Sequence, residues 1–169
     1  MTMETELLSP EPTSVFRGLG KVPPDAILML EQDHREVESR FAAYNLLTDE
    51  AAKQKVRETI CMLLKAHMFV EEQILYPRAA AAVGDGMVNH AIAEHSKAKQ
   101  LINEIELGSA SDVDSLVEGL RAAIEEHVAE EETEFFPKLR EASLLWYELG
   151  AAMAARRAEV LQHLKAQQG

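Results

Sequence analysis

Two short stretches of the chain carry histidine and glutamate at a spacing that could bind metal ions. His67 is followed four residues later by Glu71, and His127 is followed four residues later by Glu131. Residues four apart on a helix lie on the same face. An imidazole beside a carboxylate is a donor pair that iron, manganese and zinc accept. The spacing therefore predicts two helix faces that bind metal.

The two stretches belong to an internal repeat. Both contain the histidine, adjacent glutamates, an aliphatic or aromatic pair and a final proline at identical offsets. A further histidine precedes each stretch at nearly the same distance, His34 before His67 and His95 before His127, and an acidic residue stands directly before it. The chain is thus predicted to repeat one two-helix unit in tandem.

Apolar residues at alternating spacings of three and four predict the helices that position these side chains. We expect helices over about 25–47, 50–80, 87–107 and 113–140, with Pro77 loosening the last turn of the second. Short connections between such helices give antiparallel neighbours. The predicted fold class is all-α, an antiparallel up-down-up-down four-helix bundle.

The predicted domain organisation has three parts. An N-terminal arm over 1–24 precedes the bundle over 25–140, which divides into two-helix repeats at 25–80 and 86–140. An additional C-terminal helix over 143–165 is rich in alanine and amphipathic. We expect this helix to pack on the bundle or to form the contact of a homo-oligomer.

Six polar side chains would converge at the middle of this bundle, namely His34, His67, Glu71, His95, His127 and Glu131. Burying them without compensation would cost about as much free energy as the whole stability of a domain, roughly 5–15 kcal/mol. A cation is therefore expected. Two carboxylates that can each bridge two ions, with four imidazoles divided between the ions, predict a binuclear site for iron, with manganese or zinc as alternatives.

The residues next to the six candidate ligands are not expected to bind the metal. Glu72 and Glu132 follow the ligands by one position, about 100° around the helix; they are expected to be solvated surface acids, with support of the ligands as the alternative. Asp33 and Glu94 precede the ligating histidines and are expected to point elsewhere. Tyr76, with Phe136 in the second copy, is expected to close the end of the core, and His163 to lie on the surface.

The net charge, the apolar stretches and the cysteine content limit which partners and which cellular location are expected. The 29 acidic against 17 basic residues give a net charge of −12, which argues against nucleic-acid and anionic membrane partners. Residues 1–8 are acidic and do not resemble a secretory signal, and no apolar stretch reaches the roughly 18 residues that span a bilayer. The single cysteine, Cys61, fits a reducing compartment. We expect a cytoplasmic protein whose partners are metal ions.

At these residues the sequence resembles the hemerythrin-like (HHE cation-binding) family. The family pattern is a histidine on the first and third helices and His-x-x-x-Glu on the second and fourth. The matching residues here are His34; His67 and Glu71; His95; and His127 and Glu131. The resemblance covers about 25–140 and implies a non-haem di-iron centre, oxo- or hydroxo-bridged, in a left-handed bundle that takes up a small diatomic ligand.

The sequence departs from the oxygen-carrying members of this family at one position. Those proteins have a fifth histidine four residues before the third-helix ligand, where this chain has Ala91. His90 stands next to it, about 140° around the helix from His95, and would reach the site only if the helix were distorted. The remaining four-His, two-Glu set resembles bacterial members that meet nitric oxide or repair damaged iron centres.

Two classes of function follow from these patterns. The favoured one is a module that binds or senses oxygen or nitric oxide, or holds iron, because nothing outside the site resembles a substrate pocket or a nucleotide motif. The alternative is a redox enzyme of nitric oxide or peroxide stress or of iron-centre repair. A helical bundle with a vestigial or zinc-loaded site is the third reading.

Overall fold

The computed structural model describes residues 25–108, 112–142 and 146–167, and within these ranges the chain is helical with short connections and no strand. The arm predicted over 1–24 lies outside the described residues. Four long helices follow the predicted order: α1 (Ala26–Leu46), α2 (Glu50–Val70), α4 (Asp85–Leu107) and α5 (Val113–Glu130). The predicted all-α bundle is confirmed.

Helix ends are set by aspartate caps and by glycines. Asp25, Asp49 and Asp112 each accept a hydrogen bond from the backbone N–H three residues on, at 2.8–3.0 Å, which satisfies a donor that the first turn leaves free. Gly84 and Gly108 close helices with positive φ angles of 89° and 61°, a conformation that favours glycine. These residues mark the predicted turns.

The second helix of each repeat is interrupted by one π-helical turn that begins at the glutamate of the His-x-x-x-Glu motif. These turns are η1 (Glu71–Leu75) and η2 (Glu131–Phe135), followed by α3 (Tyr76–Val83) and α6 (Phe136–Glu141). The backbone N–H groups of Tyr76 and Phe136 donate to the carbonyls of Glu71 and Glu131, five residues back. Proline follows in both copies, and the wider turn avoids the clash that its ring would cause in an α-helix.

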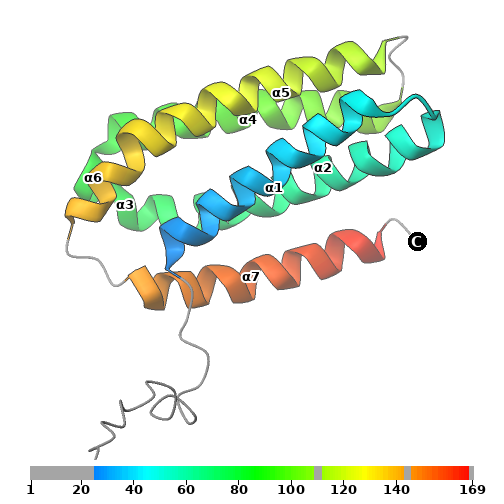
Figure 1. The fold of residues 1–169 in the computed structure, drawn as a ribbon. Coiled ribbons are helices and arrows are strands. Elements are labelled where there is room, and N and C mark those ends of the chain that lie inside the picture. Colours follow the sequence, from blue (N-terminus) through cyan, green and yellow to red (C-terminus); the bar gives the residue numbers. More distant parts are fainter. Residues whose placement is uncertain (1–24, 109–111, 143–145, 168–169) are drawn as a thin grey trace, which may run out of the picture.

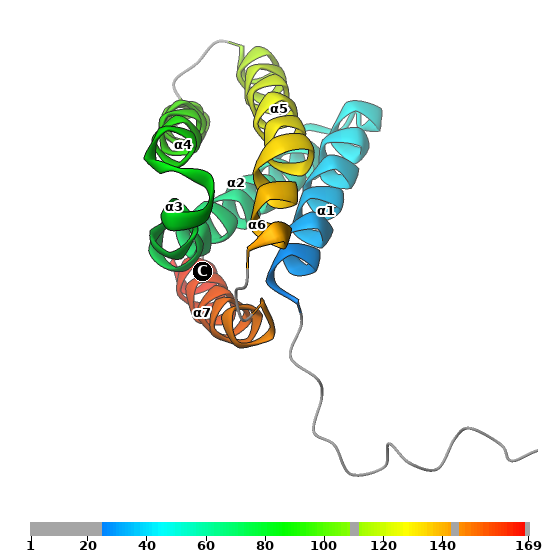
Figure 2. The ribbon, with the colours of Figure 1, turned by 90° about the vertical axis from the view of Figure 1, so that its left-hand side faces the viewer.

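The helices form two antiparallel hairpins. α1 pairs with α2, and α4 pairs with α5, while α3 and α6 lie together at one end (Figures 1 and 2). The last helix, α7 (Trp146–Ala166), lies against α1 and α2 on the side away from α4 and α5. Among the described residues, no helix has both the length and the apolar character that crossing a membrane requires.

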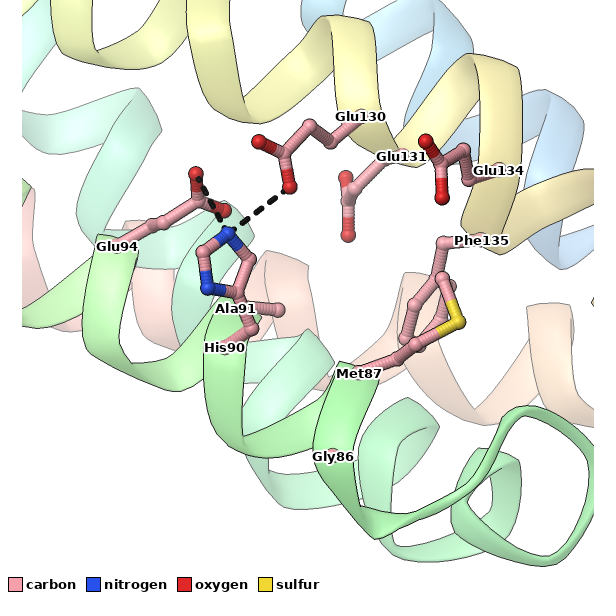
Figure 3. A pocket seen from close by; sticks show the side chains of 9 residues that line it. All are labelled: Gly86, Met87, His90, Ala91, Glu94, Glu130, Glu131, Glu134 and Phe135. Carbon is pink, nitrogen blue, oxygen red and sulfur yellow. Dashed lines mark ion pairs between the residues drawn. The ribbon is translucent and has the colours of Figure 1, made fainter.

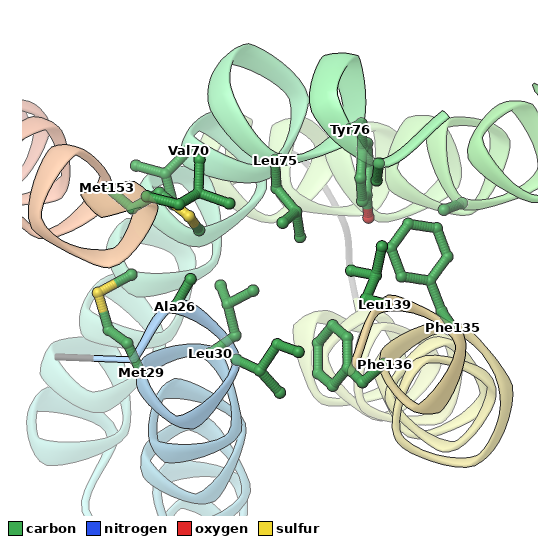
Figure 4. Close-up of a cluster of buried hydrophobic side chains, with 14 of the residues drawn as sticks. Ala26, Met29, Leu30, Val70, Leu75, Tyr76, Phe135, Phe136, Leu139 and Met153 are labelled. Atoms are coloured by element: carbon green, nitrogen blue, oxygen red, sulfur yellow. The ribbon is translucent and has the colours of Figure 1, made fainter. Parts of the chain in front are cut away.

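Two apolar clusters fill the bundle, one toward each end. The first gathers around Leu30, Leu75 and Phe136 and receives Met153 from α7 (Figure 4). The second gathers around residues such as Phe41. The polar residues of the predicted site stand between these clusters along each helix, so the site lies at a level of the bundle that apolar packing encloses on both sides.

Candidate metal centre

The structure brings the six predicted donors together in one buried cluster, here called the central cluster. Donor atoms of His34, His67, Glu71 and Glu131 lie within 4.8 Å of one another, and so do those of Glu71, His95 and His127. All six side chains are buried, with exposed fractions of 0–4%. Glu71 belongs to both groups, so the two groups are continuous.

The Nε2 atoms of the histidines form two pairs. His34 Nε2 lies 3.2 Å from His67 Nε2, and His95 Nε2 lies 3.0 Å from His127 Nε2. The first pair comes from the first hairpin and the second pair from the second hairpin. Imidazole nitrogens this close need either a shared proton or a shared cation between them.

Each carboxylate of the central cluster faces two histidines, one from each pair. Oε2 of Glu71 lies 3.2 Å from His67 Nε2 and 3.3 Å from His95 Nε2. Oε2 of Glu131 lies 3.6 Å from His127 Nε2 and 3.4 Å from His34 Nε2. The arrangement is two imidazole pairs with two carboxylates between them, and every carboxylate crosses from its own hairpin to the other.

The outer nitrogen of every histidine meets a carboxylate. The contacts, each from Nδ1, are His34 to Glu132 at 2.8 Å, His67 to Asp33 at 3.4 Å, His95 to Glu72 at 2.8 Å and His127 to Glu94 at 2.8 Å. A carboxylate on Nδ1 fixes the tautomer in which Nε2 is free to bind a metal, as is usual for metal-ligating histidines. The interpretation of Glu72 and Glu132 as solvated surface acids was wrong, as was the expectation that Asp33 and Glu94 point elsewhere.

The reason for that difference is the packing of neighbouring helices. A side chain about 100° from the inward direction is only partly solvated in a bundle, because it points along the flank of the next helix; Glu72 and Glu132 are 20% and 29% exposed. Glu72 therefore reaches His95 on α4, and Glu132 reaches His34 on α1. The signal in the sequence was the acidic residue at the same place in both copies of the repeat.

The buried carboxylates fit a cation. Within the described part of the chain, both oxygens of Glu71 and Oε2 of Glu131 lack a hydrogen-bond donor of good geometry. A buried charge without a partner is costly, and four nearby Nε2 atoms are acceptors whenever they carry no proton. Metal ions would satisfy the oxygens and the nitrogens together.

Protons take the place of the cation when the centre is free of metal. Burial opposes protonation of His67, but the charge of Glu71 and hydrogen bonds with Asp33 and Glu71 outweigh it and raise the pKa of His67 to about 10. Burial is likewise outweighed at His95, where Glu71 and Glu72 raise the pKa to about 9. The pKa of Glu71 is held well below its usual range, against its burial, by His67 and His95.

Tyr76 also reaches the central cluster. Its hydroxyl donates a hydrogen bond to Glu131 Oε1 at 3.0 Å and lies 3.2 Å from His95 Nε2. Burial and then the charges of Glu71 and Glu131 raise its pKa well above the usual value, so the phenol keeps its proton. The sequence placed Tyr76 at the end of the core. Its repeat counterpart Phe136 stacks on His34 with ring centroids 5.9 Å apart.

His90 does not join the central cluster. Its side chain is 60% exposed, and Nε2 lies 3.0 Å from Glu130 Oε2. The helix is not distorted there, so the residue stays where ordinary helical geometry puts it. His163, on α7, is exposed and contacts Gln167 as a surface residue would.

Comparison with known proteins identifies the family of this arrangement. The hemerythrin HHE cation binding domain matches residues 25–139. The crystal structure of a hemerythrin HHE cation binding domain-containing protein from Mycobacterium kansasii superposes with a TM-score of 0.71 at 20% identity, covering 83% of this chain and 89% of that one. At that identity the likeness shows the fold alone.

A curated relative is longer than this chain. A protein named DNA nickase from Nostoc sp. (strain PCC 7120 / SAG 25.82 / UTEX 2576) is 28% identical over 130 residues, which are 76% of this chain. The match spans 37% of the length of that relative.

Proposed function

Because the chain belongs to the hemerythrin HHE cation-binding family, we propose that its central cluster holds two iron ions and binds a small diatomic molecule, oxygen or nitric oxide. The observation that carries the proposal is the pairing of imidazoles around shared carboxylates. His34 and His67 would hold one ion, and His95 and His127 the other. Glu71 and Glu131, each facing a histidine of both pairs, would contact both ions.

Iron is proposed because of the ligand atoms that the central cluster offers and because of the chemistry that iron supplies. The central cluster offers nitrogen and oxygen without a thiolate, which suits iron and also accepts manganese or zinc in a purified sample. Cys61 lies in the second apolar cluster and takes no part. When bound, iron supplies open coordination positions and reversible redox chemistry that imidazole and carboxylate lack.

The space beside the central cluster supports a ligand of a few atoms. A cavity of about 10 Å³ lies next to the first imidazole pair, between Val37, Leu64 and Ile124. A cavity of that size has room for about one water-sized molecule. An organic substrate would not fit there, and the mostly apolar walls suit a small uncharged molecule.

A redox enzyme of nitric oxide or peroxide stress, or of iron-centre repair, is the second candidate because of Tyr76. A buried phenol that keeps its proton, 3.0 Å from Glu131 and 3.2 Å from His95, could donate that proton to a molecule bound at the centre. The hydroxyl of Tyr76 is therefore the group that would serve the enzyme as its proton donor.

The proposed setting is the cytoplasm, without a nucleic-acid partner. The net charge of −12 disfavours binding to a phosphate backbone. The match to a DNA nickase spans little more than a third of that protein, so we do not extend its named activity to this chain. A contact between copies through α7 stays a prediction.

The test is the metal content of protein purified without added metal, followed by anaerobic reduction and optical spectra after addition of oxygen or nitric oxide. We expect roughly two iron ions per chain, in line with the two imidazole pairs, and a reversible spectral change. Irreversible oxidation or turnover would favour the enzyme. One tightly held zinc, or no metal, would overturn the di-iron centre.

Variants tie that metal to the central cluster. We expect His67→Ala and Glu131→Ala to lower the metal content, because each removes a donor, whereas the exposed His163→Ala should keep it. Far-ultraviolet circular dichroism checks that each variant remains helical. Equal metal content in all three folded variants would contradict the assignment.

A further inference from the structure

The repeat relates the two hairpins, but their outer sides differ. α7 covers the first hairpin, where Met153 packs beside Val70 and Met29 (Figure 4). On the second hairpin the equivalent positions are polar or small. Matched through the ligating histidines, the pairs are Met29 with His90, Leu30 with Ala91, Val70 with Glu130 and Ile74 with Glu134.

A pocket opens on the second hairpin at these positions (Figure 3). It has a volume of about 190 Å³, room for several water molecules at about 30 Å³ each. Ala91 leaves this space, whereas its counterpart Leu30 is completely buried in the first apolar cluster. Glu131 lines the pocket and points into it from η2 (Figure 3). The pocket therefore connects the surface with a donor of the central cluster.

One oxygen of the buried carboxylate at the inner end of the pocket accepts no hydrogen bond from the described residues. The residue is Glu131, which is 2% exposed, and the oxygen is its Oε2. Oε1 is occupied by the Tyr76 hydroxyl. A charged oxygen in this position attracts a cation that enters the pocket, because the buried surroundings screen its charge weakly.

Three donors surround the mouth of the pocket and form what we call the outer cluster: His90, Glu94 and Glu130. Nε2 of His90 lies 3.0 Å from Glu130 Oε2 and 3.6 Å from Glu94 Oε1, as Figure 3 shows. The three donor atoms lie within 4.8 Å of one another. The other oxygen of Glu94 accepts a hydrogen bond from His127 Nδ1 at 2.8 Å, so one carboxylate touches both clusters.

We propose that this pocket is the route by which divalent cations reach the central cluster, and that the outer cluster binds a cation transiently at its mouth. The inference rests on the proposed function, since it needs a cation-binding centre. The acidic mouth attracts cations by its charge. Two carboxylates and one imidazole replace part of the hydration shell before the cation reaches Glu131. The outer cluster offers its ion three donors and is partly exposed, whereas each ion of the central cluster would have two imidazoles and two shared carboxylates in a buried site, so the outer cluster holds its ion less tightly.

The test measures the rate at which metal-free protein takes up Fe²⁺ under anaerobic conditions. We expect Glu130→Gln to slow uptake by at least roughly threefold, as loss of electrostatic steering does, and His90→Gln to slow it by removing an imidazole ligand of the outer cluster. Both variants should leave the final iron content unchanged. Glu126→Gln, the same change of charge on an exposed residue one turn away on α5, should load at the normal rate, as should His163→Gln.

A second kind of variant narrows the pocket without changing its charge. Ala91→Leu introduces the residue that fills the equivalent space in the first hairpin, and it should slow Fe²⁺ uptake while all carboxylates remain.

The outer cluster is tested by titration with excess Mn²⁺. Electron paramagnetic resonance should detect one weakly bound ion per chain beyond those held by the central cluster, and Glu130→Gln should lose this additional ion.

The outcomes separate the two proposals. Normal uptake rates in all pocket variants of a chain that loads fully would overturn the route, and the absence of an additional Mn²⁺ ion would overturn the outer site. A wild-type chain that holds no metal would overturn the proposed function, and the route with it.

Discussion

The hydroxyl of Tyr76 supplies a donor where the repeat counterpart Phe136 has none. It hydrogen-bonds Glu131 Oε1, so we expect Tyr76→Phe to leave that buried oxygen unpaired in the metal-free protein. The free energy of unfolding should fall by about 1–3 kcal/mol, measured by urea denaturation. Tyr147→Phe, at a position 57% exposed, should change it by less than about 0.5 kcal/mol. Equal effects of the two substitutions would contradict the role of the Tyr76 hydroxyl.

Cys61 makes the stability of the folded chain depend on pH in the alkaline range. Burial, with a smaller effect of the charge of Glu106, raises its pKa from 9.0 to about 12. The folded chain keeps the thiol proton where the unfolded chain releases it, so this contribution to stability is lost as pH rises from about 9 to about 12.

A labelling measurement checks the state of Cys61. At pH 10, iodoacetamide should alkylate the native protein far more slowly than the urea-unfolded protein, because the buried thiol is neutral and covered. Cys61→Ser gives the background. Equal rates for native and unfolded protein would mean that the thiol is neither buried nor protonated.

Residue patterns predicted that the six side chains of the central cluster would converge inside the bundle, but not what surrounds them. His34 and its repeat partner His95 stand on apolar stripes, and a period of 3.6 residues is enough to turn both inward. The carboxylates on Nδ1 depend on how close the flanks of two helices come, which no single helix pattern contains. Tyr76 lies in the apolar cluster at the end of the bundle, as predicted, but the contact of its hydroxyl with Glu131 was not predicted, because the π-helical turn before it shifts its direction relative to an unbroken α-helix.

At the level of the elements, α7 reaches the centre through one ion pair. Arg157 contacts both oxygens of Asp33, at 2.8 and 2.7 Å, and Asp33 in turn meets His67 Nδ1. The amphipathic pattern of α7 predicted that one face would be buried, but it could not tell which helices would receive it. The guanidinium contributes to this choice because Asp33 is a buried acid on α1, alongside Leu149 and Met153, which pack into the first apolar cluster.

Breaking that ion pair should weaken the attachment of α7. Arg157→Gln is expected to lower the free energy of unfolding by about 1.5–3 kcal/mol, the range for a hydrogen bond to a charged group, in urea denaturation followed by circular dichroism. Arg156→Gln, next to it but 49% exposed, should cost at most about 1 kcal/mol. The prediction fails if the two losses are the same.

The π-helical turns were visible in the sequence only through their prolines. Pro77 indicated a disturbance near the end of the second helix, but residue types do not show whether a proline kinks, ends or widens a helix. The structure places the disturbance directly at Glu71 and Glu131, where it sets the direction in which both carboxylates enter the centre.

Across the whole molecule, the central cluster is complete only when both hairpins are present. One hairpin supplies two histidines and one glutamate, and each glutamate also faces a histidine of the other hairpin. A lone two-helix unit could assemble the same set of donors by pairing with a copy of itself, since a two-fold pair repeats every contact. The chain has the architecture of such a homodimer joined into a single polypeptide. Because the two halves are separate stretches of sequence, they need not be identical, and one is covered by α7 while the other has an acidic opening.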